Sequence, residues 1–144
     1  MKKIYLASPF FDAHECYYYR LAIDCLRSAG YEVYAPQEHS IEGGWEMPNA
    51  EWARKVYSND IDAIHKSDVV MILNFGMYSD SGTAWEAGYA YGWKIPTVQV
   101  LCGGENATYS LMMMNGCNRI VEFQHLTNWE EKSAEVDLDS IIQK

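Results

Sequence analysis

The sequence lacks the features that mark secreted, membrane-spanning and metal-binding proteins. Its four cysteines form no CxxC pair and no Cys/His cluster with the spacing of metal ligands, so we expect reduced thiols and no metal site. The chain enters a strand-like run at residues 4–7 without the long apolar segment and small-residue cleavage site of a secretory signal. No apolar run approaches the length of a membrane span. These absences predict a cytoplasmic protein with no membrane partner.

Basic residues are also scarce. The chain has 11 Lys and Arg but 20 Asp and Glu, which gives a formal net charge of -9 at pH 7. The basic residues are scattered, with no run longer than Lys2-Lys3. Because nucleic-acid binding draws most of its affinity from clustered Lys and Arg, this pattern argues against a nucleic-acid partner. Small neutral ligands remain open.

No linker rich in Pro, Gly or Ser divides the chain, and it has no internal repeat or low-complexity segment. Of its 144 residues 49% are hydrophobic, which is enough apolar material for one core of ordinary size. We therefore expect residues 1–144 to form a single domain.

Patterns typical of strands and helices alternate along this domain. Apolar runs predict strands at residues 4–7, 31–35, 68–73, 95–101 and 119–123. Apolar residues spaced by three and four predict helices at residues 18–29 and 49–66. A capping-box pattern at Thr127 predicts a C-terminal helix that carries Ala134, Leu138 and Ile141 inward. Such alternation indicates a flavodoxin-like or Rossmann-like α/β fold, a five-stranded parallel sheet in the order 2-1-3-4-5 with helices on both faces.

One carboxylate stands out in the segment after the third predicted strand. Asp80 or Ser81 is a natural N-cap for a helix that begins over Gly82 and extends to about Trp93. Glu86 is the only charged residue of this helix, and small and aromatic residues surround it. Burying a carboxylate without a partner is costly, so Glu86 is expected to be neutralised, hydrogen-bonded or retained for chemistry. The alternative is an ordinary capping or surface glutamate.

A second carboxylate lies on the apolar side of the helix predicted at residues 49–66. Asp60 completes, at helical spacing, an apolar stripe that consists of Ala53, Val56, Tyr57, Ile61 and Ile64. An aspartate on the core-facing side of a helix either belongs to a site or bonds a backbone group or a neighbouring tyrosine. The sequence leaves both interpretations open.

Polar and aromatic residues follow the first predicted strand. Ser8 and Phe10 come just after the strand that contains Tyr5, at the carboxyl edge where open parallel sheets bind ligands. In the predicted strand order the first and third strands are adjacent, which brings Tyr5 and Ser8 close to Asp80 and the Glu86 helix. The alternative is that Tyr5 and Phe10 are core aromatics and that Ser8 is a turn residue.

On these residues the chain resembles the nucleoside 2-deoxyribosyltransferases over nearly its whole length. The segments that carry the resemblance are residues 4–7, 57–60 and 80–88. The resemblance implies that Glu86 attacks C1′ of a 2′-deoxynucleoside and that Tyr5 orients Glu86. It also implies that Asp60 manages the proton on the departing base and that Asp80 holds the sugar 5′-OH.

Further candidates for substrate contacts are Ser8, Phe10, Asn59, Gly82, Ser110 and Met112. The segment Ser110-Leu111-Met112 resembles one that reaches into the site of the neighbouring subunit, although there the sequence departs from transferases that have asparagine at the position of Ser110. The run at residues 111–114 is apolar, and exposed apolar patches often mark contacts between chains. We therefore expect a homo-oligomer, a dimer, tetramer or hexamer, with shared active sites. The alternative is a buried turn before the fifth strand.

The carboxylates and the resemblance together predict the transfer of 2-deoxyribose from a 2′-deoxynucleoside to a free nucleobase. The reaction would be ping-pong and retaining, through a covalent glycosyl-Glu86 intermediate, with no cofactor. One alternative is a nucleotide N-glycosidase of the same fold that cuts 5′-monophosphates with water. Asp80 would repel a phosphate and residues 8–11 contain no arginine, whereas the Ser110 hydroxyl suits a phosphate as well as a 5′-OH. The other alternative is a non-catalytic nucleoside-binding module.

Overall fold

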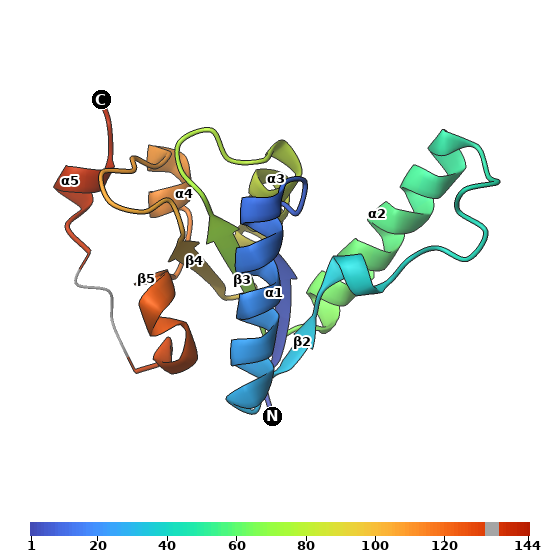
Figure 1. Ribbon diagram of the computed structural model, residues 1–144, viewed down its shortest axis with the longest axis horizontal. Coiled ribbons are helices and arrows are strands. Elements are labelled where there is room, and N and C mark those ends of the chain that lie inside the picture. The colour runs from blue at the N-terminus through green and yellow to red at the C-terminus, as the bar shows by residue number, and fades with distance from the viewer. Residues whose placement is uncertain (132–135) are drawn as a thin grey trace.

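The computed structural model describes residues 1–131 and 136–144 of the chain. Within these residues, five parallel strands form one sheet in the order β2-β1-β3-β4-β5 (Figure 1). The strands are β1 (Lys3–Ala7), β2 (Glu32–Tyr34), β3 (Val69–Asn74), β4 (Thr97–Leu101) and β5 (Arg119–Glu122). The predicted parallel sheet and its strand order are confirmed.

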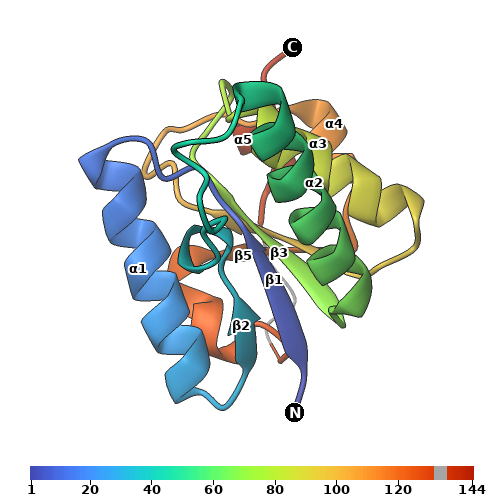
Figure 2. The ribbon, with the colours of Figure 1, turned by 90° about the vertical axis from the view of Figure 1, so that its right-hand side faces the viewer.

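Helices cover both faces of the sheet, as predicted (Figure 2). The described helices are α1 (Ala13–Ser28), α2 (Asn49–Lys66), α3 (Ser81–Gly92), α4 (Leu111–Asn115) and α5 (Leu138–Ile141), with 3-10 helices η1 (Pro36–Glu38) and η2 (Phe123–Asn128). One hydrophobic cluster joins α1 and η2 to one face, and a second joins α2 and α3 to the other. Successive side chains of a strand point to opposite faces, so Leu6 of β1 enters the first cluster and Tyr5 enters the second.

Only the C-terminal half of α2 covers the sheet. Ile64 is buried, and Val56 and Ile61 are half-buried, but Ala53 and Tyr57 are exposed. The first half of α2 extends away from the sheet together with the loop that precedes it (Figure 1). The prediction that the whole apolar stripe faces the core is therefore wrong for Ala53 and Tyr57 within one chain.

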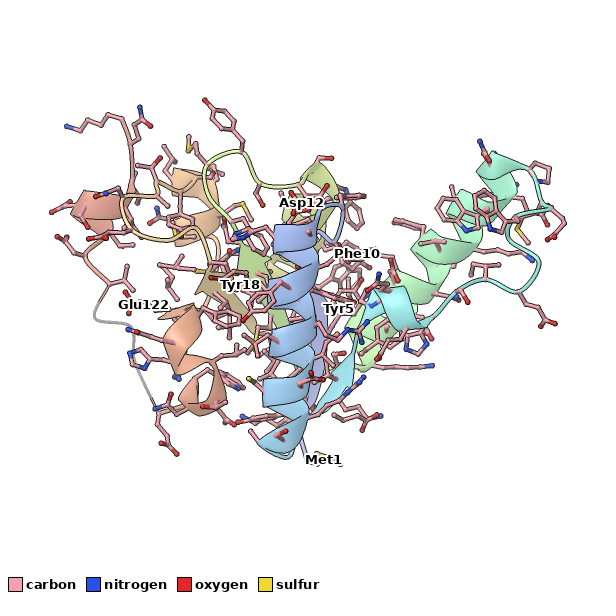
Figure 3. The ribbon with its side chains drawn as sticks, viewed as in Figure 1. Met1, Tyr5, Phe10, Asp12, Tyr18 and Glu122 are labelled. Carbon is pink, nitrogen blue, oxygen red and sulfur yellow. The ribbon has the colours of Figure 1, made fainter. Side chains whose placement is uncertain are left out.

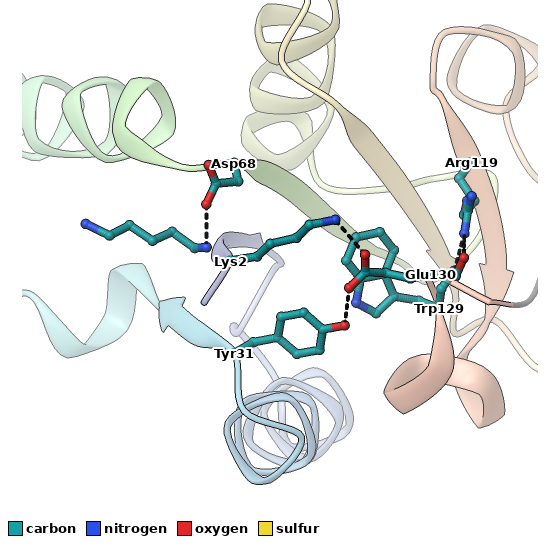
Figure 4. Close-up of polar contacts among 7 residues, drawn as sticks. Lys2, Tyr31, Asp68, Arg119, Trp129 and Glu130 are labelled. Carbon is teal, nitrogen blue, oxygen red and sulfur yellow. Dashed lines mark hydrogen bonds and ion pairs between the residues drawn. The ribbon is translucent and has the colours of Figure 1, made fainter.

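The prediction that a helix begins at Thr127 is wrong. Residues 123–128 form η2, and the chain then turns. A capping box at Thr127 would require the Glu130 side chain to reach back to the backbone of Thr127. Instead, the Glu130 carboxylate accepts hydrogen bonds from Lys2 and Tyr31 (Figure 4). The Glu130 side chain, which the capping box needs, therefore bonds residues that are distant in the sequence.

Two further contacts hold the residues that follow η2. Trp129 is buried in the cluster under α1, and the Arg119 guanidinium donates to the carbonyl oxygens of residues 129 and 130, at 2.6 and 2.7 Å. Of the residues expected to point inward from the predicted C-terminal helix, Leu138 is exposed, Ile141 is half-buried and Ala134 lies outside the described residues.

Two features concern the expected partners. The apolar run at residues 111–114, expected at an interface with a buried turn as the alternative, lies in the short helix α4, which packs on α3 and contributes Met113 to the second cluster. None of the helices in residues 1–131 and 136–144 combines the length and the apolar composition that a membrane span needs.

Candidate active site

The core of the site is a contact between Tyr5 on β1 and Glu86 on α3. Tyr5, the middle residue of β1 (labelled in Figure 3), is buried, and its hydroxyl donates a hydrogen bond to Oε2 of Glu86. α3 places Glu86 there because Ala87 and Ala90 are small enough to let this helix pack closely on the sheet. Oε1 of Glu86 accepts no hydrogen bond from the residues that the structure describes. One carboxylate oxygen is thus held, and the other is free for a ligand.

The environment of this pair controls the charge that it carries. Burial raises the pKa of Glu86 to about 7, the hydrogen bond from Tyr5 opposes that rise, and the nearby charges of Asp60 and Asp80 add to it. Burial also holds the pKa of the Tyr5 phenol far above its usual range, so Tyr5 remains a hydrogen-bond donor. Glu86 therefore changes its charge near neutral pH, where an unperturbed glutamate is fully ionised.

Asp60 on α2 is the second carboxylate of the site. It is half-buried, and this burial raises its pKa to about 6, although the charge of His39 works in the opposite direction. Asp60 and Glu86 are close enough for the charge of one to raise the pKa of the other. Asp60 accepts no hydrogen bond from the described residues, so the backbone or tyrosine partner that the sequence left open is not present.

Asp80 caps the helix that carries Glu86, as the sequence predicts. Its Oδ2 accepts hydrogen bonds from the backbone nitrogen and the hydroxyl of Thr83, at 2.8 and 3.0 Å. Its Oδ1 has no such bond among the described residues. At Gly82 an added Cβ would stand 3.2 Å from Asp80 Oδ2, which explains a glycine beside this cap. Tyr5, Asp60, Asp80 and Glu86 thus share one face of the sheet, or its carboxyl edge.

A comparison with protein families identifies the family of the chain. A family model described as nucleoside 2-deoxyribosyltransferase matches residues 4–138. The chain belongs to the nucleoside 2-deoxyribosyltransferase family. This membership confirms the resemblance drawn from the sequence, and it identifies the chain as a glycosyl-transferring enzyme that acts on nucleosides.

Solved structures agree with this membership. A 2-deoxyribosyltransferase from Bacillus psychrosaccharolyticus is 28% identical with a TM-score of 0.76, over 99% of this chain and 97% of that one. A conserved protein from Enterococcus faecalis V583 (21% identity, TM-score 0.76, 90% and 96% of the two chains) and a CMP N-glycosidase from Clostridium botulinum (20%, 0.57, 91% and 100%) share the fold. Comparison with curated proteins gave no match.

Two of the expected substrate contacts, Ser8 and Phe10, make contacts within the fold. Ser8 is buried and its hydroxyl donates to the carbonyl oxygen of Pro9 at 2.8 Å, which is the behaviour of a turn residue. Phe10, beyond the carboxyl end of β1 (Figure 3), packs against Tyr19 of α1 with ring centroids 5.2 Å apart. Its ring therefore joins the cluster on the opposite face from Glu86.

A stack of three rings continues outward from Tyr5 and was not predicted. Tyr34 of β2 stacks on Tyr5 (centroids 5.6 Å apart, planes at 12°), and His39 stacks on Tyr34 (4.0 Å, 7°). Tyr34, His39 and the predicted contact Asn59 line a cavity of about 400 Å³ between α2 and the strands β1 and β2. The sequence held one signal for the stack. In the predicted strand order residues 31–35 lie beside residues 4–7, but only the register pairs Tyr34 with Tyr5.

The two remaining candidates lie at the start of α4. Ser110 is the N-cap residue of this helix, and its hydroxyl makes no hydrogen bond with the described residues. Met114 is buried, whereas Met112 is 73% exposed and Leu111 is 52% exposed. The apolar run is thus partly core and partly surface.

Among the described residues no group of three or more His, Cys, Asp or Glu side chains is placed to hold a metal ion.

Proposed function

We propose that this enzyme transfers 2-deoxyribose between nucleobases through a covalent glycosyl intermediate on Glu86. The observation that carries the proposal is the arrangement of the Glu86 carboxylate. Tyr5 holds one of its oxygens by a hydrogen bond, its other oxygen is free, and the Asp60 carboxylate lies close by. A nucleophile and a proton donor of this kind are sufficient to exchange the base on a glycosidic carbon.

The first half of the reaction releases a base. Oε1 of ionised Glu86 forms a bond to C1′ of the 2′-deoxynucleoside as the bond from C1′ to the base nitrogen breaks, and protonated Asp60 gives its proton to the departing base. A pKa of about 6 leaves part of Asp60 protonated near neutral pH, and a pKa of about 7 leaves part of Glu86 ionised. The products are the free base, a glycosyl ester on Glu86 and an Asp60 carboxylate.

The second half reverses these steps with a different base. A nitrogen of the incoming base attacks C1′, Asp60 takes the proton that this nitrogen loses, and Glu86 leaves as a carboxylate. Two inversions at C1′ give overall retention. Transfer requires that the ester survive until the second base arrives, so water must be kept from it.

Asp80 is proposed to bind the sugar 5′-hydroxyl. Its Oδ2 is occupied by Thr83, and its Oδ1 is free to accept a hydrogen bond from a substrate hydroxyl. The negative charge of Asp80, which acts on Glu86, would also repel a 5′-phosphate. This charge favours nucleosides over nucleotides.

A homo-oligomer with shared sites is part of the proposal. Exposed apolar side chains support it in two places, at Leu111 and Met112 on α4 and where Tyr57 of α2 meets Trp85 of α3, with ring centroids 5.7 Å apart. A second chain on this surface would cover the exposed apolar rings of Tyr57 and Trp85.

One observation favours a second function, cleavage of 5′-monophosphates by water. The Ser110 hydroxyl is unbonded among the described residues and is a possible donor to a phosphate oxygen. This alternative needs a positive charge to neutralise the phosphate, and the ionisable groups that perturb Glu86 and Asp60 include two aspartates and a histidine but no Lys or Arg.

A base-exchange assay tests the proposal. The enzyme is mixed with a 2′-deoxynucleoside and a different free base, and both nucleosides are followed by chromatography. We expect the swapped deoxynucleoside to form, and intact-protein mass spectrometry without an acceptor base to show an added deoxyribosyl group that is absent in Glu86→Ala. Release of the base with only free sugar as the second product, or cleavage confined to a 5′-monophosphate, would contradict transfer and support the glycosidase.

A further inference from the structure

A buried pair of amide side chains joins the carboxyl end of β3 to the middle of β4. Asn74 is the last residue of β3 and Gln99 lies within β4, and both are fully buried. Nδ2 of Asn74 donates to Oε1 of Gln99 at 3.1 Å, and Oδ1 of Asn74 accepts from the backbone nitrogen of Gly76 at 3.0 Å. The Gly76 bond defines the amide orientation, because only the oxygen of Asn74 accepts from a backbone N–H.

This orientation leaves one polar atom without a partner. Because Asn74 presents its nitrogen to Gln99, the Gln99 oxygen must face Asn74, and Nε2 of Gln99 has no hydrogen-bond partner among the described residues. Buried donors are nearly always paired, and an unpaired one is unfavourable. A pair of apolar side chains would fill this position without that penalty, so fold stability alone does not explain the amides.

The contacts of Asn74 reach the segment that leads to Asp80, the proposed 5′-OH ligand, and the helix that begins at Ser110. Gly76, with φ of 133°, begins the segment that leads to Asp80, and its backbone conformation is one that side-chain-bearing residues rarely adopt. Nδ2 of Asn74 also lies 3.8 Å from Sδ of Met113 on α4, the helix that begins at Ser110. One side chain thus contacts both the segment before Asp80 and the helix after Ser110.

We propose that Asn74 is a positioning residue for recognition of the sugar 5′-hydroxyl. Through Gly76 it sets the course of the chain to Asp80, and through Met113 it sets the place of the helix that starts at Ser110. This inference depends on the proposed function, in which Asp80 binds the 5′-OH. Asn74 itself touches no substrate.

The test compares two substrates that differ only at the 5′ position. A 2′-deoxynucleoside and the matching 2′,5′-dideoxynucleoside are assayed for base exchange, and the ratio of their kcat/KM values measures recognition of the 5′-OH. We expect a ratio of about ten or more in the wild type, the typical effect of a hydrogen bond to a charged group. In Asn74→Leu/Gln99→Leu the ratio falls toward one, because kcat/KM decreases for the hydroxylated substrate and changes little for the other.

Three further variants make the result specific. Gln99→Leu keeps the bond from Gly76 to Asn74 and is expected to keep the ratio. Thr97→Val removes a buried hydroxyl at the opposite end of β4, where it bonds Asn118 at 3.2 Å, and controls for loss of a buried polar group. Asn74→Ala, which has no acceptor and adds no bulk, replaces the double variant if thermal melting shows that the latter does not fold.

The outcomes separate this inference from the proposed function. Calorimetric binding of both nucleosides to the Glu86→Ala protein needs no turnover, so it reports 5′-OH recognition even if the wild type exchanges no bases. Absence of exchange would overturn the proposed function alone. The role of Asn74 would be overturned if its variants lost the same share of kcat/KM for both nucleosides or kept the ratio unchanged. It would also be overturned if the Glu86→Ala protein with Asn74 intact bound both nucleosides equally or bound neither.

Discussion

Removal of the Tyr5 hydroxyl tests the central contact of the site. Tyr5→Phe keeps the ring, its burial and its stack on Tyr34 but deletes the hydrogen bond to Glu86. That bond stabilises the ionised form of Glu86 and so lowers its pKa. Without the bond the pKa must rise further above about 7, and a larger fraction of the enzyme is inactive at neutral pH.

The size of the effect follows from the energy of the lost bond. A hydrogen bond to a charged group contributes about 1.5–3 kcal/mol, and one pKa unit corresponds to about 1.4 kcal/mol, so the pKa of Glu86 rises by about 1 to 2 units. The ionised fraction at pH 7 then drops from about a half to between about a tenth and a hundredth. We expect kcat/KM at pH 7 to be about 5- to 50-fold lower than in the wild type. This deficit should shrink in alkaline buffer, where Glu86 is ionised in both proteins and both lose the protonated Asp60 alike.

The assay is the initial rate of base exchange from pH 5 to 10. The acid limb of kcat/KM should move to higher pH in Tyr5→Phe by about 1 to 2 pH units, the rise in the pKa of Glu86. Because Glu86 and Asp60 titrate as a coupled pair, the apparent pKa values of the variant are compared with those of the wild type. Tyr34→Phe is the matched control, since its hydroxyl makes no hydrogen bond in the described residues and its ring stack is retained. An acid limb that stays in place, or a loss that is equal at every pH, would refute the assigned role of Tyr5.

Three other predictions follow from the same geometry. Asp60→Asn keeps the shape of Asp60 but has no carboxylic proton, so kcat should fall about 100-fold or more while the affinity for a deoxyribose-bearing inhibitor stays the same; an unchanged kcat would remove Asp60 from the mechanism. Glu86→Gln should raise the free energy of unfolding above pH 7 by on the order of 3 kcal/mol, because the pKa of Glu86 rises from 4.5 to about 7 on folding and its ionisation therefore opposes folding. Below pH 4 Glu86 is protonated in both states and the substitution should have no such effect. Denaturant melts below pH 4 and at pH 8 test this, and equal stability of variant and wild type at pH 8 would contradict it. Met112→Glu should weaken self-association in light scattering and lower activity on dilution, while Tyr17→Glu, at a comparably exposed site on α1, should do neither. A wild type that is monomeric and fully active at every concentration would exclude shared sites.

The sheet could be predicted because its signals are local and mutually consistent. Each strand is an apolar run of the right length, and alternation with helices leaves few topologies for a parallel sheet. The N-cap at Asp80 and the C-terminal half of α2 follow from patterns within single turns. The failures occurred where contacts distant in sequence compete with local patterns. At Thr127 the capping box lost its glutamate to Lys2 and Tyr31, which no local window contains.

The exposed half of α2 shows a different limit. An apolar stripe shows that a surface will be covered, but it does not say by what. Ala53 and Tyr57 satisfy the helical period as well as Ile64 does, yet only Ile64 finds the sheet of its own chain. A second copy that covers Tyr57 and Trp85 would make the whole stripe consistent, and this is the reason to regard the stripe as support for an oligomer.

The two carboxylates were the most predictable part of the site for a physical reason. Glu86 and Asp60 were recognised because each interrupts a surface that is otherwise apolar, and such a surface is where ionisation is hardest. The structure places their pKa values at about 7 and about 6, above the ordinary range, with burial as the main cause of both shifts. The property that made them stand out in the sequence is therefore the property that suits them to the proposed acid-base chemistry near neutral pH. Tyr34 and His39 interrupt no pattern, since an aromatic residue in a strand and a histidine in a loop are ordinary. Their stack on Tyr5 arises from strand register, which a single sequence does not specify.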